Sequence, residues 1–241
     1  MRALLVSDLH LEFHNDFGES FIKTLSKDCD IVFLAGDITI SNYIPHTLQM
    51  FAKHFKKQQV LYVHGNHDYY KSSIDKTIGV TKHAIKHFKL DNIHHLSNDI
   101  FTFNGQRILG TTLWFDEEVH APTWAMTDFG QIENSHIDIY EANKKSVSFL
   151  TQEMKENDVV ITHHLPSEIC IAWEYRDSPL NPFFVHQLDN LIINRKPKLF
   201  HFGHTHVSFD DTLGVTRLVC NPCGYYGYEL NKYFEQKIIE I

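Results

Sequence analysis

The first part of the chain, up to residue 88, alternates short apolar runs with amphipathic stretches. In the amphipathic stretches the apolar side chains recur at helical spacing, as Ile74, Ile78 and Ile85 do. The predicted strands are Arg2–Ser7, Asp30–Ala35 and the run ending at His64, and the predicted helices are Glu19–Lys27, Pro45–Lys57 and Ile74–Phe88. Because a helix follows each strand, the pattern predicts a parallel sheet.

After Asn92 the apolar runs become shorter, which suggests a second, largely antiparallel sheet. Its first predicted strands are Ile93–Leu96, Ile100–Phe103 and Arg107–Thr111. Further strands are predicted at Asp158–Thr162, Leu199–Phe202, Val207–Asp210, Val215–Cys220 and Gln236–Ile241. Helices are predicted at Tyr140–Asn157 and Pro182–Asn194, and two aromatic-rich stretches, 112–138 and 165–181, show little periodicity. We expect one α/β domain (α+β under some schemes) over residues 1–241, with helices flanking two packed sheets.

Composition narrows the class of protein. The chain is 43% apolar and 22% charged, as globular proteins are, and no apolar run approaches the ~20 residues of a membrane span. The first strand begins almost at Met1 and leaves no room for a signal peptide, so we expect a cytoplasmic protein without membrane contact. A net charge of −8 argues against binding long nucleic acids. Cys220-Asn-Pro-Cys223 lacks a second pair, so we expect it to pack a turn.

Polar fragments follow five of the predicted strands, where open α/β sheets place ligand sites. These fragments are Asp8-Leu9-His10, Gly36-Asp37, Gly65-Asn66-His67-Asp68, His163 and Gly203-His204-Thr205-His206. Their candidate metal ligands are Asp8, His10, Asp37, Asn66, His163, His204 and His206. Seven protein ligands are too many for one ion. Mixed imidazole, carboxylate and amide ligands suit Mn, Fe or Zn rather than Ca or Mg. We therefore expect two divalent transition-metal ions, and favour manganese.

The order of these fragments resembles the calcineurin-like metallophosphoesterase superfamily, including its class III phosphodiesterase branch. The resemblance spans residues 8–206 and implies a four-layer sandwich of helices and two mixed sheets. It also implies that Asp8, His10 and His206 hold one ion and that Asn66, His163 and His204 hold the other. Asp37 would bridge the two ions. Asn221-Pro222 resembles a turn that lies near the site in many members.

These ligands predict a dinuclear phosphoesterase that hydrolyses a P–O bond. Two dications and two aspartates leave a charge of about +2, which attracts a phosphate. A pair of ions ~3.5–4 Å apart would yield a bridging hydroxide and clamp the phosphoryl oxygens. His67 is the expected catalytic acid for the leaving group. Some branches orient this histidine with an aspartate at the position of Ile40, so Asp68 or a backbone carbonyl is left as its candidate partner.

The two irregular stretches are placed to overhang the metals and shape a pocket. Trp114, Trp124, Trp173 and Tyr175 could stack a base there, with Arg176 binding a phosphate oxygen, although such aromatics can equally fill a core under loops. We expect a small phosphodiester or nucleotide-type substrate. The alternatives are a phosphomonoesterase or phosphoprotein phosphatase, a nuclease, and a non-catalytic scaffold of the same fold. The oligomeric state stays open.

Overall fold

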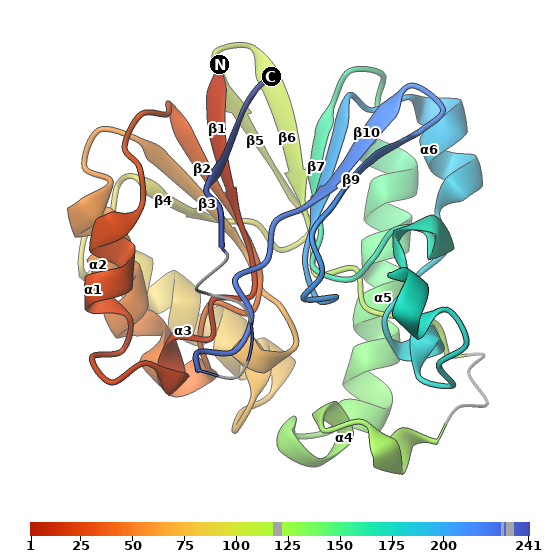
Figure 1. Ribbon diagram of the computed structural model, residues 1–241. Coiled ribbons are helices and arrows are strands. Elements are labelled where there is room, and N and C mark those ends of the chain that lie inside the picture. The colour runs from red at the N-terminus through yellow and green to blue at the C-terminus, as the bar shows by residue number, and fades with distance from the viewer. Residues whose placement is uncertain (118–121, 228, 230–233) are drawn as a thin grey trace.

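The protein forms two β-sheets that pack face to face between two groups of helices (Figure 1). This computed structural model describes residues 1–117, 122–227, 229 and 234–241. The first sheet has five strands in the order β11-β1-β2-β3-β4, and the second has six in the order β5-β6-β7-β8-β10-β9. The predicted α/β sandwich with two mixed sheets is thus confirmed.

The strands are short. In the first sheet they are β1 (Arg2–Val6), β2 (Ile31–Ala35), β3 (Gln59–Val63), β4 (Ile93–His95) and β11 (Lys237–Glu240). In the second they are β5 (Asp99–Phe103), β6 (Gln106–Gly110), β7 (Val159–Ile161), β8 (Leu199–Phe202), β9 (Phe209–Leu213) and β10 (Thr216–Cys220).

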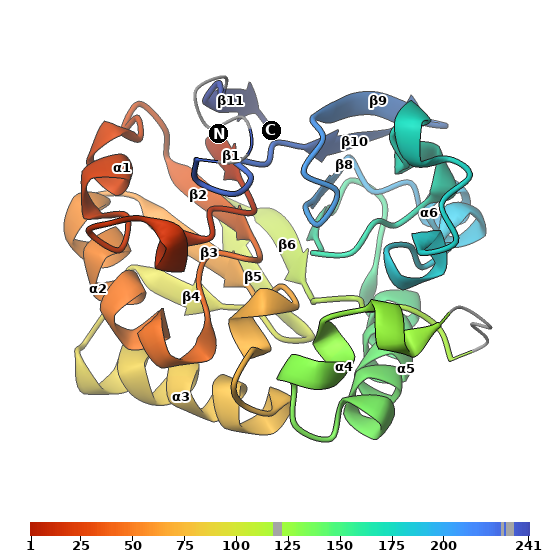
Figure 2. The same cartoon turned by 60° about the horizontal axis from the view of Figure 1, so that its bottom comes forward.

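The helices lie on the outer faces of the two sheets (Figure 2). The first sheet is covered by α1 (Glu19–Thr24), α2 (Ile44–His54) and α3 (Ile74–His87). The second is covered by α5 (Ser135–Glu153) and α6 (Asp189–Arg195), while the short α4 (Asp128–Gln131) precedes α5.

Alternating side chains of β1 show how the four layers hold together. Leu4 and Val6 belong to a buried cluster with Leu48 of α2. Ala3 and Leu5 point the other way, into a cluster that both sheets share. Because a strand buried on both faces needs apolar residues at every position, these strands appear in the sequence as continuous apolar runs.

The second sheet is not largely antiparallel, so that expectation is wrong. Its strands β6, β7, β8 and β10 run parallel, and only the edge strands β5 and β9 are antiparallel to their neighbours. The reason is that α5 and α6 lie in the crossovers between parallel strands. As a result, the loops at the carboxyl ends of the parallel strands of both sheets lie in one region.

Two predicted elements differ from the structure. The expected helix Pro182–Asn194 is interrupted, because Leu165 donates its N–H to Phe184 and accepts one from His186; only Asp189–Arg195 is α-helical. The stretch 112–138 is less irregular than expected, because it contains α4 and the start of α5. Its residues 118–121 lie outside the described part of the chain. Among the described residues, no helix has the length and apolar composition needed to cross a bilayer.

Candidate metal centre and the adjoining cavity

The structure gathers all the predicted metal ligands at the carboxyl ends of β1, β2, β3, β7 and β8. They lie in two groups. In the first group, Nε2 of His10 lies 3.1 Å from Nε2 of His206, and Oδ1 of Asp8 lies 3.6 Å from the same His206 atom. Such separations are close enough for one ion to bind all three, given metal–nitrogen distances of ~2.0–2.1 Å.

The second group surrounds His163. Its Nε2 lies 2.9 Å from Oδ1 of Asn66 and 3.4 Å from Oδ1 of Asp37. Asp37, His163 and His204 each offer a ligand atom, and these atoms all lie within 4.8 Å of one another. The other carboxylate oxygen of Asp37, Oδ2, lies 3.8 Å from Nε2 of His10 in the first group. The Asp37 carboxylate therefore faces both groups.

Several polar atoms of this region are buried without a partner among the described residues. They include Oδ2 of Asp8 and Nε2 of His204. Burying such atoms unsatisfied is costly, and a bound cation would satisfy them. The donor set of imidazole, carboxylate and amide suits a transition metal. The residues therefore fit the two ions that the sequence predicts.

The backbone of the site is strained. Asp8, His10, Asp37, His204 and His206 have φ angles of 53°, 45°, 53°, 70° and 51°, in the left-handed region that residues other than glycine rarely adopt. Each such residue costs ~1–3 kcal/mol, and strain of this kind concentrates at functional sites. The loops thus hold ligands in place at the expense of stability.

Neighbouring groups fix the orientation of the ligands. The Nδ1 atom of His163 lies 2.8 Å from the carbonyl oxygen of Ala35, which leaves Nε2 directed at the site. Burial would lower the pKa of His163, but the Asp37 carboxylate outweighs burial and raises that pKa to about 9. A metal ion must therefore displace a proton from this imidazole. Nδ1 of His206 lies 2.7 Å from Oε2 of Glu229.

The amide of Asn66 is oriented by a buried carboxylate on α4. Its Nδ2 donates to Oδ1 of Asp128 at 2.8 Å, so its Oδ1 faces His163. Asp128 also accepts a hydrogen bond from the hydroxyl of Tyr70 at 2.7 Å. The segment 112–138 therefore contributes directly to the geometry of the second ligand group.

Asp68 does not orient the neighbouring His67. Its carboxylate is buried and accepts hydrogen bonds from the backbone N–H groups of Asp37, Thr39 and Gly65. These bonds tie the loop after β2 to the loop after β3. Because its carboxylate points at these backbone groups, Asp68 is not the partner that orients His67.

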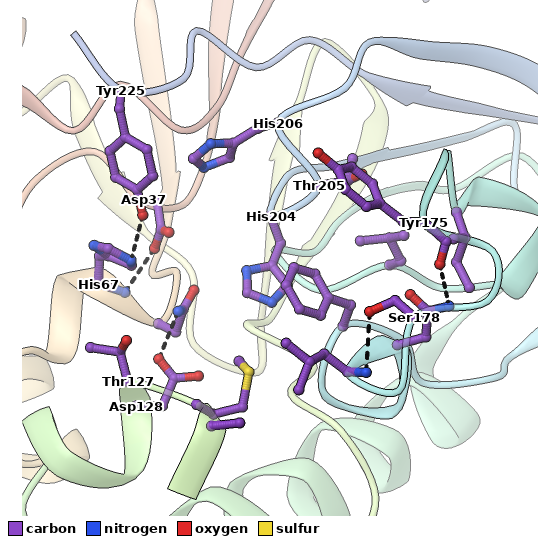
Figure 3. A pocket seen from close by; sticks show the side chains of 18 of the residues that line it. Asp37, His67, Thr127, Asp128, Tyr175, Ser178, His204, Thr205, His206 and Tyr225 are labelled. Carbon is purple, nitrogen blue, oxygen red and sulfur yellow. Dashed lines mark hydrogen bonds between the residues drawn. The ribbon is translucent and has the colours of Figure 1, made fainter. Parts of the chain in front are cut away.

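His67 lies beside the ligands and lines the cavity (Figure 3). Its backbone N–H donates to Oδ1 of Asp37 at 2.8 Å, and its ring stacks on Tyr70 with centroids 4.2 Å apart. The hydroxyl of Tyr225 points at the ring, with its oxygen 3.2 Å from Nε2. Burial would lower the pKa of His67, but Asp37 and Glu12 outweigh it and the pKa is raised.

A cavity of about 390 Å³ opens next to the two ligand groups. Its apolar wall is formed by Met126, Leu165, Ile171, Leu180 and Phe184. No lysine or arginine lines it within the part of the chain that the structure describes. The cavity therefore suits a small molecule with an uncharged, largely apolar portion.

Of the five residues predicted to contact substrate, the structure places only Tyr175 in the lining of this cavity. Trp114 is 0% exposed and packs against Tyr69 and His164, so it has no surface on which to stack a substrate. Trp173 is 79% exposed and lies outside the lining, and the Arg176 guanidinium sits over its ring at 4.8 Å. Trp124 is 88% exposed and also lies outside the lining.

Several residues around the ligands were missed in the sequence, among them Glu12, Tyr225 and Asp128. Glu12 had a usable signal, because it follows His10 by two residues as His10 follows Asp8. Tyr225 follows the Asn221-Pro222 turn. The backbone of this turn and of the residues directly after it forms hydrogen bonds with the backbone of Ser7 and Asp8. Asp128 had no local signal, because its contacts with Asn66 and Tyr70 join residues about sixty positions apart.

Comparison with known proteins identifies the family of the chain. The sequence profile of the calcineurin-like phosphoesterase family matches residues 1–208, and the chain belongs to this family. A search among proteins of curated function finds no match.

Solved structures share the fold. The phosphopantetheinyl hydrolase PptH from Mycobacterium tuberculosis is 14% identical, with a TM-score of 0.71 over 92% of this chain and 89% of that one. The protein TT1561 of Thermus thermophilus is also 14% identical, with a TM-score of 0.63 over 92% of this chain and 88% of that one. At this identity the likeness establishes the fold alone.

Close packing at Gly65 makes a first prediction. A Cβ atom there would lie 2.1 Å from Oδ1 of Asp37 and 2.5 Å from the Asp37 nitrogen. We expect Gly65→Ala to displace Asp37, to destabilise the fold by ~1–3 kcal/mol and to lower the metal content. Thermal unfolding and mass spectrometry of the metal-loaded protein measure both effects.

Gly79→Ala is the matched control, because a Cβ atom at this position in α3 meets nothing within 4 Å. It should leave the metal content unchanged and stabilise the protein by ~0.5–1 kcal/mol. Wild-type stability and metal content in Gly65→Ala would show that Asp37 is not held as described.

Proposed function

We propose that this protein is a metal-dependent phosphoesterase that hydrolyses the P–O ester bond of a small phosphodiester or nucleotide-type substrate. The observation that carries the proposal is the position of the Asp37 carboxylate, with Oδ2 3.8 Å from Nε2 of His10 and Oδ1 3.4 Å from Nε2 of His163. A carboxylate so placed can serve two ions at once. The family to which the chain belongs supports the same activity.

Asp8, His10 and His206 would hold one ion, and Asn66, His163 and His204 the other, with Asp37 between them. When bound, such a pair supplies the Lewis acidity that activates a water molecule and neutralises the phosphoryl oxygens. Mn, Fe and Zn all suit these ligands, and we favour Mn. With two dications and two aspartates the site would carry about +2, which attracts an anionic ester despite the net charge of −8.

His67 is the proposed acid that protonates the leaving group. It lines the cavity, and an imidazole can donate a proton near neutral pH. Stacking on Tyr70 and the hydrogen bond from the backbone N–H of His67 to Asp37 fix the position of this imidazole. The proton would leave from Nε2, because this atom faces the Tyr225 hydroxyl in the cavity.

The lining of the cavity supports the substrate class. Tyr175 and Phe184 offer aromatic surface, and Ser178 and Asn181 offer polar groups, for a small ester arm. A nucleic acid would need cations along its path, and the described lining contains no lysine or arginine. A small diester with one uncharged organic arm fits best.

Removal of the shared carboxylate tests this function. We expect Asp37→Ala to abolish Mn²⁺-dependent hydrolysis of bis-nitrophenyl phosphate and to lower the metal content toward zero, because both ligand groups lose their common partner. The exposed Asp211→Ala serves as control and should keep both activity and metal. Two ions retained in Asp37→Ala would refute the bridging role, and wild-type protein inactive on every mono- and diester offered with Mn²⁺ would refute the function.

The acid role of His67 makes a separate prediction. His67→Ala should lower kcat by ~10²–10⁴ for alkyl phosphodiesters, whose poor leaving groups need a proton. Nitrophenyl esters should lose far less, because nitrophenolate leaves unaided. The comparison is made at saturating metal, with the exposed His83→Ala as control. Equal losses on the two kinds of ester would contradict the assignment.

A further inference from the structure

Glu12 is a buried acid next to the candidate metal ligands and His67. It lies in the short 3-10 helix Leu11–Phe13, directly after the loop that carries Asp8 and His10. Its side chain is only 7% exposed, and neither carboxylate oxygen has a hydrogen-bond partner among the described residues. An unsatisfied buried carboxylate is costly, so a group that compensates its charge is expected close to it.

Two imidazole rings present the same atom to this carboxylate. Oε1 of Glu12 lies 3.6 Å from Nδ1 of His10 and 3.9 Å from Nδ1 of His67. The Nε2 atoms of both rings face the opposite way: that of His10 faces His206, and that of His67 faces Tyr225. The rings meet edge to face, with centroids 4.6 Å apart. The Glu12 carboxylate thus lies on the Nδ1 side of both a candidate metal ligand and the proposed acid.

Other carboxylates near His67 are committed elsewhere. Asp68 accepts backbone N–H groups, and Oδ1 of Asp128 accepts from Asn66 and Tyr70. Asp37 receives the backbone N–H of His67 rather than its ring. Ile40 is buried in the same apolar cluster as Tyr70 and offers no acceptor side chain. Glu12 is therefore the carboxylate that faces the Nδ1 side of the ring.

We propose that Glu12 is the positioning residue for His67, accepting its Nδ1–H so that Nε2 is aimed at the leaving group. The same carboxylate accepts the Nδ1–H of His10 and steadies that ring toward its ion. This inference rests on the proposed function, in which His67 is the acid. The distances from Oε1 of Glu12 to the two Nδ1 atoms are longer than a hydrogen bond allows. Catalytic hydrogen bonds are often long in the absence of substrate and tighten in the complex.

Kinetics with two leaving groups test this role. At saturating metal, Glu12→Leu should lower kcat on alkyl phosphodiesters by ~10–100-fold, with a much smaller loss on nitrophenyl esters. Glu12→Gln keeps an oxygen that can accept one Nδ1–H, so it should recover part of the loss. The exposed Glu19→Leu serves as control and should match wild type.

A double-mutant cycle separates positioning from general damage. If Glu12 acts through His67, Glu12→Leu has no acid to position in the His67→Ala background. Adding it there should lower kcat on alkyl esters by no more than it lowers kcat on nitrophenyl esters. A loss of equal size in the wild-type and His67→Ala backgrounds would overturn the proposal. So would equal losses of Glu12→Leu on the two kinds of ester.

A measurement on the zinc-loaded protein with inorganic phosphate bound does not depend on turnover. ¹H–¹⁵N NMR should show an exchange-protected ring Nδ1–H line that disappears in His67→Ala and also in Glu12→Leu. Absence of this line in wild type, or its persistence in Glu12→Leu, would overturn the proposal. If wild type instead hydrolyses no phosphoester while the line behaves as expected, the proposed function fails and the contact between Glu12 and His67 stands.

Discussion

The site depends on one buried carboxylate surrounded by imidazoles. Asp37 faces His10 and His163 with its two oxygens and receives the backbone N–H of His67. The loops after β1, β2, β3 and β7 therefore meet at a single group. Because these polar atoms are removed from water, they need opposite charge to balance them, and two cations would supply it.

The architecture explains how such a costly arrangement can persist. Strands buried on both faces give each sheet a rigid, apolar body, and β1, β2 and β8 carry ligand loops with left-handed residues at their ends. The strain in these loops is offset by packing elsewhere in the fold. Asp68 and Asp128 then fix the loops and the Asn66 amide from behind.

Much of the fold could be predicted from the sequence, because apolar runs and helical spacing report burial directly. The same patterns located the loops that carry the seven candidate ligands, since parallel strands place their ends together. The direction of the strands in the second sheet was less accessible, because it depends on crossovers through α5 and α6. The interrupted helix after Pro182 was missed because pairing of Leu165 with a distant segment decides it.

The surroundings of the ligands were harder to predict for a related reason. Asp128 and Tyr225 reach the site through contacts that no local pattern encodes. Trp114 shows the opposite error: an aromatic residue in a loop suggested a binding surface, whereas the fold buries it. Sequence reasoning thus works best for groups fixed by the ends of strands and least well for groups brought in by packing.

The proposed activity depends on two ions that share Asp37 between the two ligand groups. Crystals of the protein grown with Mn²⁺ and measured at the manganese absorption edge would test it most directly. Two anomalous peaks ~3.5–4 Å apart are expected, one on each side of the Asp37 carboxylate. A single peak, or peaks away from Asp37, would contradict it.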